Sequence, residues 1–198
     1  MKLAATLFYI LVFVNVCFAQ TQHDREISPF TRVEVLDEID LVLQQGETPK
    51  LQLEYHGIDP CSIITENKGN KLTIYLDTNA QPVEGAQVTA YVTYATLKEL
   101  TVIGSSHVVN NSPIKSDRFV LRSFGSNDVF LEEVQARKWK AAFYGENRFS
   151  VGKGKVTVLR VKEYGNNKLN FRQVASDMLK VVPWVIIGNS PGGLSYSL

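Results

Sequence analysis

Cysteine is nearly absent from this 198-residue chain, which contains only two. Cys17 lies in a segment that we expect to be cleaved, so Cys61 is the only thiol expected in the mature chain and no internal disulfide can form. An exported protein without disulfides has to be held together by packing and backbone hydrogen bonds. Because Cys61 lies beside Ile63 and Ile64, we expect a small core residue there, with a reactive thiol as the alternative.

A strong net charge is also absent, because 21 Lys and Arg residues stand against 20 Asp and Glu residues, for a net charge of +1. Nucleic-acid-binding domains are usually strongly basic, so the composition argues against that class. One local basic cluster, Arg137-Lys138-Lys140, is interrupted by Trp139. We interpret the cluster as a solvated strand face, and Trp139 and Trp184 as core or end-cap residues.

Catalytic and metal-binding patterns are missing as well. The three histidines are scattered, without the spacing of metal ligands: they are His23, His56 and His107. Glycosidases need two carboxylates about 5–9 Å apart, and neither Asp128 nor Glu163 has a second carboxylate at a matching place in the repeat described below. We therefore expect no enzyme, no metal and no cofactor, with a carbohydrate-active enzyme as the alternative.

The N-terminal residues have the pattern of a secretory signal. Met1-Lys2 is a short basic start, an apolar run follows, and Cys17-Phe18-Ala19 has small residues where a signal peptidase requires them. A membrane span needs about 20 apolar residues, and this run is shorter. We predict a signal peptide over 1–19, a short disordered segment over 20–27, and export to the periplasm or to the cell surface in association with the outer membrane. Lipidation at Cys17 or a retained anchor is the alternative.

No segment has a convincing helical period. Stretches with apolar residues at every second position recur instead, at 33–35, 39–43, 51–55, 72–76, 88–92 and 100–102. This period is the pattern of a strand with one buried face, and turn-forming residues separate the stretches. We predict an all-β chain, but a spacing of about ten residues fits a sandwich, a barrel or a solenoid.

A repeat in the second half of the chain selects among these architectures. Glycines recur at spacings of 20 to 23 residues: Gly104, Gly125, Gly145, Gly165 and Gly188. Asparagine follows the middle three after two residues, at Asn127, Asn147 and Asn167. A leucine-rich repeat would need leucine-like residues five positions before each asparagine, where this chain has Arg122, Ala142 and Lys162. The period therefore predicts a parallel β-helix with about 20 residues per coil, in one domain over 28–198. We expect less regular coils over 28–95 and regular coils over 96–198.

The repeated positions have different predicted roles. Glycine at a corner allows a positive φ without a Cβ penalty. By strand alternation, each asparagine points the same way as apolar residues such as Val129, so the asparagines should form a ladder inside the solenoid. Asp128, Arg148 and Lys168 should then form an outward column, in which the pair Asp128 and Arg148 contributes at most about 1 kcal/mol.

Aromatic residues immediately before the glycines are the binding candidate. Phe124, Tyr144 and Tyr164 would form a stripe about 10 Å long. An outward stripe would suit sugar rings or the apolar surface of a partner, whereas an inward stack would only fill the core. Alternation does not decide between them, because a turn intervenes.

Several segments resemble the head-GIN domain family, known as putative autotransporter adhesins of Bacteroidetes. The segments are FTRVEVLDEIDLVLQQGETPKLQLEY (30–55), KLTIYL (71–76), GSSHVV (104–109), GSNDVF (125–130) and GNSPGGLSY (188–196). The resemblance implies a right-handed single-stranded β-helix on an exported protein, and little about chemistry. GENRF and GNNKL depart from the family's pattern, because Arg148 and Lys168 replace an acidic residue. Any ligand of an acidic column in relatives, such as a cation, would be lost here.

These observations predict an exported, non-enzymatic β-solenoid that binds a glycan or a protein, with no nucleic acid partner and no transmembrane span. A third candidate is a structural module that assembles through its open end coils, because a solenoid must cap or pair its terminal strands. The strand-like end GLSYSL (193–198) should either fold over the last coil or meet a second subunit in a homo-oligomer.

Overall fold

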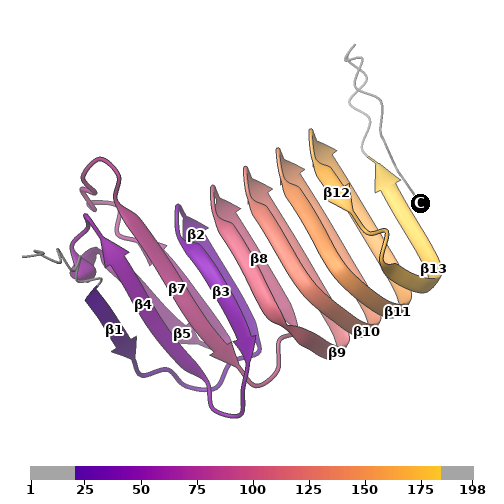
Figure 1. The fold of residues 1–198 in the computed structure, drawn as a ribbon, viewed down its shortest axis with the longest axis horizontal. Helices are drawn as coiled ribbons and strands as arrows, with labels where there is room; N and C mark the ends of the chain where they lie inside the picture. Colours follow the sequence, from indigo (N-terminus) through magenta and orange to yellow (C-terminus); the bar gives the residue numbers. More distant parts are fainter. Residues whose placement is uncertain (1–20, 184–198) are drawn as a thin grey trace, which may run out of the picture.

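The computed structural model describes residues 21–183, which form a 13-stranded sheet and one short 3₁₀ helix (Figure 1). The elements are β1 (Thr21–Arg25), β2 (Arg32–Asp37), β3 (Asp40–Gln45), β4 (Lys50–His56), η1 (Pro60–Ser62), β5 (Ile63–Lys68), β6 (Lys71–Leu76), β7 (Gln87–Tyr94), β8 (Glu99–Gly104), β9 (His107–Gly125), β10 (Asp128–Gly145), β11 (Arg148–Gly165), β12 (Lys168–Asn170) and β13 (Val174–Pro183). The predicted signal peptide, Gly188, Trp184 and the GLSYSL end lie outside the described residues.

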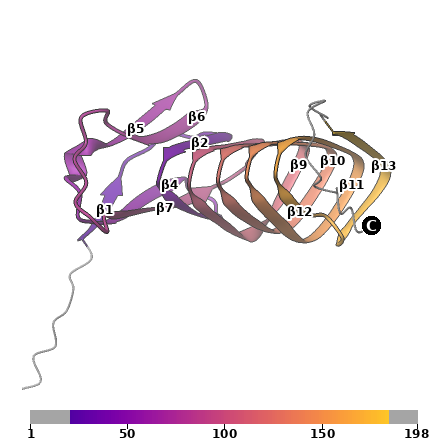
Figure 2. The ribbon, with the colours of Figure 1, turned by 90° about the horizontal axis from the view of Figure 1, so that it is seen from above.

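The second half of the chain is a β-solenoid, as the repeat predicted. β10 pairs in parallel with β11 from Asp128 and Arg148 to Gly145 and Gly165, so residues twenty apart in the sequence lie side by side. β9 pairs in the same way with β10, and β12 and β13 pair with β11. Figures 1 and 2 show these strands as successive coils stacked along the long axis of the molecule.

Each regular coil has three straight segments. In β10, the ladder to β11 runs over 128–131, 133–136 and 138–145 and is interrupted at Glu132 and Arg137, where the chain bends. We call the third segment, with its register partners in neighbouring coils, the long side. The corner with glycine and asparagine joins the long side of one coil to the first segment of the next.

The N-terminal part differs from the less regular coils that we expected over 28–95. One parallel coil is present, since β2 pairs with β8 and β3 with β9. The other strands include antiparallel pairs, β4 with β7 and β5 with β6. The turn between β5 and β6 explains one reversal, because Gly69 and Asn70 both have positive φ. Such turns match the twist of a β-hairpin and fold the chain back on itself.

The segment predicted to be disordered, 20–27, contains strand β1, so that prediction was wrong. β1 pairs antiparallel with β4 at the N-terminal edge of the sheet. Its residues are polar, and side-chain hydrogen bonds supplement the backbone ladder. Arg25 Nη1 donates to Thr65 Oγ1 at 2.6 Å, and Gln52 Nε2 donates to Asp24 Oδ1 at 2.9 Å. Backbone pairing of this kind leaves no apolar pattern in the sequence.

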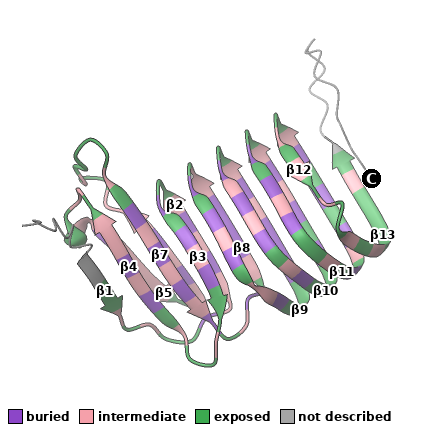
Figure 3. Ribbon diagram, in the orientation of Figure 1, coloured by how far each residue is buried: buried purple, intermediate pink, exposed green. Residues whose placement is uncertain are grey.

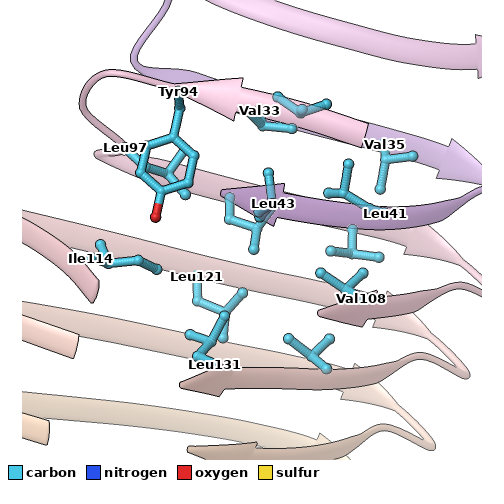
Figure 4. Close-up of a cluster of buried hydrophobic side chains, with 14 of the residues drawn as sticks. Val33, Val35, Leu41, Leu43, Tyr94, Leu97, Val108, Ile114, Leu121 and Leu131 are labelled. Carbon is cyan, nitrogen blue, oxygen red and sulfur yellow. The ribbon is translucent and has the colours of Figure 1, made fainter. Parts of the chain in front are cut away.

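One continuous hydrophobic core runs through the stack of coils. Figure 3 shows buried residues alternating with more exposed ones along the strands, and Figure 4 shows aliphatic side chains from neighbouring strands packed together inside. Trp139 is fully buried, as predicted, and packs against Phe119, Phe149 and Phe171. Arg137, Lys138 and Lys140 are exposed, so that interpretation is also confirmed.

Cys61 is exposed, so the expectation of a core residue was wrong. It lies in η1, where Asp59 Oδ1 accepts a hydrogen bond from the backbone N–H of Cys61 at 2.9 Å. Pro60 occupies the first turn of this short helix, as its fixed φ favours. The chain enters the core only at Ile63, two residues later.

Tyr94 provides a test of this packing through the pH dependence of stability. Tyr94 lies among the buried aliphatic side chains (Figure 4). Its hydroxyl donates to Asn110 Oδ1 at 3.2 Å, and burial raises its pKa from 10.0 to about 12. A raised folded-state pKa means that stability is fully present below pH 10 and is lost as pH rises toward 12.

We expect the free energy of unfolding of the unmodified protein to fall by about 1.4 kcal/mol between pH 9 and 11 because of Tyr94. Tyr94→Phe should not show this decrease. Urea unfolding of both proteins at the two pH values measures the difference in slope. Identical pH slopes in the two proteins would contradict the assignment.

Candidate functional site

The glycine corners are structural, and their geometry explains the residue type. Gly104, Gly125, Gly145 and Gly165 have φ values of 124°, 107°, 112° and 104°. A Cβ at Gly125 would lie 2.1 Å from the carbonyl oxygen of Gly104 in the preceding coil, and the other three would meet a carbonyl oxygen at 2.3 Å. Each corner therefore requires glycine both for its φ and for the close approach of two coils.

The corner column begins one coil earlier than the sequence suggested, at Asp37. Asp37 lies in register with Gly104 and has a φ of 68°. Its side chain Oδ2 accepts a hydrogen bond from the backbone N–H of Leu76 at 2.9 Å. Nothing in the sequence signalled Asp37, because it is not glycine, and because it lies 67 positions before Gly104, outside the period of about 20 residues.

The asparagines form the predicted inward ladder, which we call the amide ladder: Asn127, Asn147 and Asn167. Asn127 and Asn147 are buried, and Asn167 is half-buried at the end of the stack. Each Oδ1 accepts a hydrogen bond from the backbone N–H one coil earlier, in Ser106, Asn127 and Asn147 in turn. Each Nδ2 donates to the carbonyl three residues before it. The amide ladder thus provides hydrogen-bond partners for the buried backbone groups of the corner, and it lies inside the solenoid.

The aromatic residues form an outward column, which we call the aromatic ladder: Phe124, Tyr144 and Tyr164. Their neighbours Ser123, Phe143 and Glu163 are buried, so strand alternation places the aromatic rings on the outer surface, where they are half-buried. Successive rings stack with centroids 4.7 and 4.6 Å apart and interplanar angles of 9° and 7°. The open question of orientation is therefore answered in favour of the surface.

Ring stacking changes what the aromatic ladder can offer a ligand. Both faces of Tyr144 are covered, by Phe124 on one side and Tyr164 on the other. A sugar cannot stack on those faces, contrary to the simplest version of the stripe hypothesis. At Tyr144, a ligand can contact only the ring edge and the hydroxyl group. These offer both an apolar surface and a polar group for hydrogen bonding.

Charged side chains on the other two segments of the coil pair across neighbouring coils. Arg148 Nη1 lies 3.4 Å from Asp128 Oδ2, which confirms the predicted outward pair. Lys153 Nζ lies 2.9 Å from Glu133 Oε2, and Arg137 Nε lies 2.6 Å from Asp117 Oδ1 at the bend. The hydrogen bond from Arg137 lowers the pKa of the Asp117 carboxyl. Solvent screens these surface pairs, so each contributes little to stability.

The long side carries basic residues that sequence reasoning did not group together. Seven Lys and Arg residues occupy its outward positions in β9, β10, β11 and β13: Arg118, Arg122, Lys138, Lys140, Arg160, Lys162 and Lys180. They share this face with the aromatic ladder. Lysine and arginine at positions twenty apart were the available signal, as in Lys140, Arg160 and Lys180.

The described part of the chain contains no cluster of metal ligands and no second carboxylate in register with Asp128 or Glu163. Among residues 21–183, no group of three or more His, Cys, Asp and Glu side chains could hold a metal ion. Asp128 faces Arg148 rather than a second carboxylate, and Glu163 is buried in register with Phe143. The same range contains no helix with the length and hydropathy needed to cross a bilayer.

Comparison with known proteins supports the fold and gives a family. A family model described as "Putative auto-transporter adhesin, head GIN domain" matches residues 29–184. No curated protein matches the chain. Solved structures with the same fold include a "putative adhesin" from Parabacteroides merdae, with 15% identity, a TM-score of 0.63, and coverage of 82% of this chain and 77% of the other.

Two structures from Parabacteroides distasonis are similar to the same degree. A "putative adhesin" has 15% identity and a TM-score of 0.64, with coverage of 82% of this chain and 77% of the other. A "Putative lipid binding protein" has 16% identity and a TM-score of 0.63, with coverage of 82% and 78%. At such low identity these likenesses establish the shared fold alone.

Proposed function

The chain belongs to the head GIN domain family, and we propose that it is an exported, non-enzymatic binding module that presents one face of its solenoid to a glycan or a protein at the cell envelope. The observation that carries the proposal is the aromatic ladder. Stacking fixes three neighbouring rings on the outer surface, and rigid aromatic side chains lose little conformational entropy when they bind. The adhesin description of the family supports a binding role.

A non-enzymatic role also agrees with the placement of the acidic residues. Asp117, Asp128 and Glu133 are each joined to a basic side chain in the neighbouring coil. Their pairing with cations suits a stable surface better than acid and base catalysis, which requires a carboxyl group with a pKa near the working pH. The pKa values of Asp117 and Glu133 are instead lowered by their hydrogen-bond partners.

A glycan array probed with the mature chain tests this function. We expect Tyr144→Ala and Tyr164→Ala to weaken binding to the recognised glycan by about tenfold or more, because truncation of an aromatic contact typically costs more than 1 kcal/mol. Tyr144→Phe should retain the stack and isolate the contribution of the hydroxyl. Phe130→Ala is the matched control, because Phe130 is a half-buried aromatic on another segment of the coil.

Two results would count against the proposal. Unchanged binding in both tyrosine variants would remove the aromatic ladder from the site, and equal losses in Phe130→Ala would indicate general destabilisation. Incubation of the bound glycan with the protein, followed by measurement of glycan chain length, tests the non-enzymatic part. Shortened chains would favour the alternative of a carbohydrate-active enzyme.

A further inference from the structure

The outer face of the long side combines basic rows with the aromatic ladder. Its outward positions in β9, β10, β11 and β13 hold seven basic residues and no Asp or Glu. Arg122 pairs with Glu99 of the preceding coil. Within the described part of the chain, no ion pair involves Lys138, Lys140, Arg160, Lys162 or Lys180. A chain with a net charge of +1 thus concentrates unpaired positive charge on one side.

The register brings like charges directly beside one another. Lys140 lies in register with Arg160, and Arg160 with Lys180. Neighbouring strands are about 4.8 Å apart, so three cations follow one another within about 10 Å. Like charges directly opposite in a sheet destabilise it. A bound polyanion would relieve this repulsion, whereas the neighbouring segments relieve theirs with acidic side chains, as in the Glu133 and Lys153 pair.

A hollow of about 400 Å³ lies on the same basic surface. Nine residues line it, of which one is acidic: Asp117, Arg118, Arg137, Lys138, Trp139, Lys140, Val158, Arg160 and Met178. The carboxylate of Asp117 is paired with Arg137, so four cationic side chains in the lining remain unpaired among the described residues. Met178 is 59% exposed, so apolar contact area is available beside the cations. The hollow can therefore receive a ring that carries an acidic group, with the charge held by guanidinium and ammonium groups.

Ring geometry distinguishes between classes of polyanion. Proteins that bind single-stranded nucleic acid stack bases on the faces of aromatic rings. In the aromatic ladder, neighbouring rings already cover both faces of Tyr144. The edge and hydroxyl of Tyr144 remain for contact, and these suit the hydroxyl-rich edge of a sugar chain. The aromatic ladder runs parallel to the Lys140 row, about 13 Å away along the strand, which is within reach of one extended chain.

We propose that the long side binds an acidic polysaccharide, whose carboxylate, sulfate or phosphate groups lie along the Lys140, Arg160 and Lys180 row while neighbouring sugars contact the aromatic ladder. This inference rests on the proposed binding role and adds the chemical class of the ligand. The main support for this proposal is the unpaired basic surface, an observation that does not depend on the ring stacking.

Binding of the mature chain to heparin and to alginate tests the proposal, with neutral dextran as the negative probe. We expect binding to at least one of the two acidic polysaccharides, and weakening of about tenfold or more when salt rises from about 50 to about 200 mM. The double charge reversal Lys140→Glu/Arg160→Glu should weaken binding at low salt by about tenfold or more, because it places repulsive charges in the row.

A matched control keeps the net charge equal. Lys155→Glu/Lys168→Glu makes the same change in charge at exposed lysines on the other two segments of the coil. We expect it to change binding by less than about twofold, since these sites lie outside the long side. Equal losses in the two double variants would overturn the proposal, as would no binding to heparin and alginate at low salt. Tighter binding to an oligothymidylate or to phosphatidylglycerol vesicles would overturn it as well.

The outcomes separate this inference from the proposed function. If the array identifies a neutral glycan whose binding is lost in Tyr144→Ala, and neither heparin nor alginate binds, the binding role stands and the acidic ligand class is wrong. If no glycan on the array and neither polyanion binds, the acidic ligand class is wrong and so is the glycan-binding form of the proposed function.

Discussion

Gly145→Ala is expected to lower the free energy of unfolding by about 2–6 kcal/mol. Two costs add. The φ of 112° is rarely adopted by residues with a Cβ and costs about 1–3 kcal/mol. The new Cβ would also lie 2.3 Å from the carbonyl oxygen of Gly125, so a coil has to shift, at a cost of about 1–3 kcal/mol. That carbonyl accepts a hydrogen bond from the backbone N–H of Glu146 at 2.8 Å, which a shift would weaken.

Gly85→Ala separates the two costs. Gly85 has a positive φ of 78°, and a Cβ placed there would have no neighbour within 4 Å. We expect this variant to lose only about 1–2 kcal/mol, from the left-handed backbone alone. Urea unfolding of both variants and of the unmodified protein measures the difference. If Gly145→Ala is no more destabilising than Gly85→Ala, close stacking of the coils does not constrain the corner.

Asn147→Leu is expected to cost about 3–5 kcal/mol, although leucine has a similar size. Asn147 Oδ1 accepts hydrogen bonds from Ser123 Oγ at 2.7 Å, from Asn127 Nδ2 at 3.2 Å and from the backbone N–H of Asn127 at 3.3 Å. Its Nδ2 donates to Tyr144 O at 3.1 Å and to Asn167 Oδ1 at 2.8 Å. Each buried group left without a partner costs about 1–3 kcal/mol.

Asn167→Leu is the matched control at the end of the amide ladder. Asn167 Oδ1 also accepts two hydrogen bonds from Asn147, but Asn167 is half-buried. Water can replace part of what is lost, so we expect a cost of about 1–2 kcal/mol. Thermal unfolding of the two variants gives the comparison. Equal costs would show that burial does not determine the strength of the amide ladder.

Much of the solenoid could be predicted because its order is a repeat in the sequence. Glycine and asparagine at fixed spacing gave the coil length, and alternation from Asn127 to Val129 gave the inward direction of the amide ladder, which the buried side chains confirm. Alternation failed at Phe124 because the corner separates it from those residues. Its direction became clear only from the buried Ser123 on the preceding strand segment.

Other features could not be predicted from the sequence, because they depend on how segments far apart in the chain are arranged in space. β1 is held by the backbone of β4, and such pairing is independent of side-chain type. Cys61 lies in the 3₁₀ helix η1, which leaves its side chain exposed although two isoleucines follow closely in the sequence. The basic surface is distributed over four strands, so Lys140 and Arg160 become neighbours only when the coils are aligned.

The corner column also has a direction, which limits how the solenoid can grow. Each glycine is constrained by the carbonyl of the coil before it in the chain, as Gly125 is by Gly104, and Gly104 by Asp37. Asp37 itself tolerates a side chain because β6, its neighbour on the other side, stays in register only as far as Val35. A coil inserted ahead of β2 would therefore force aspartate to become glycine. A coil duplicated between β10 and β11 would bring its own glycine and require no change elsewhere.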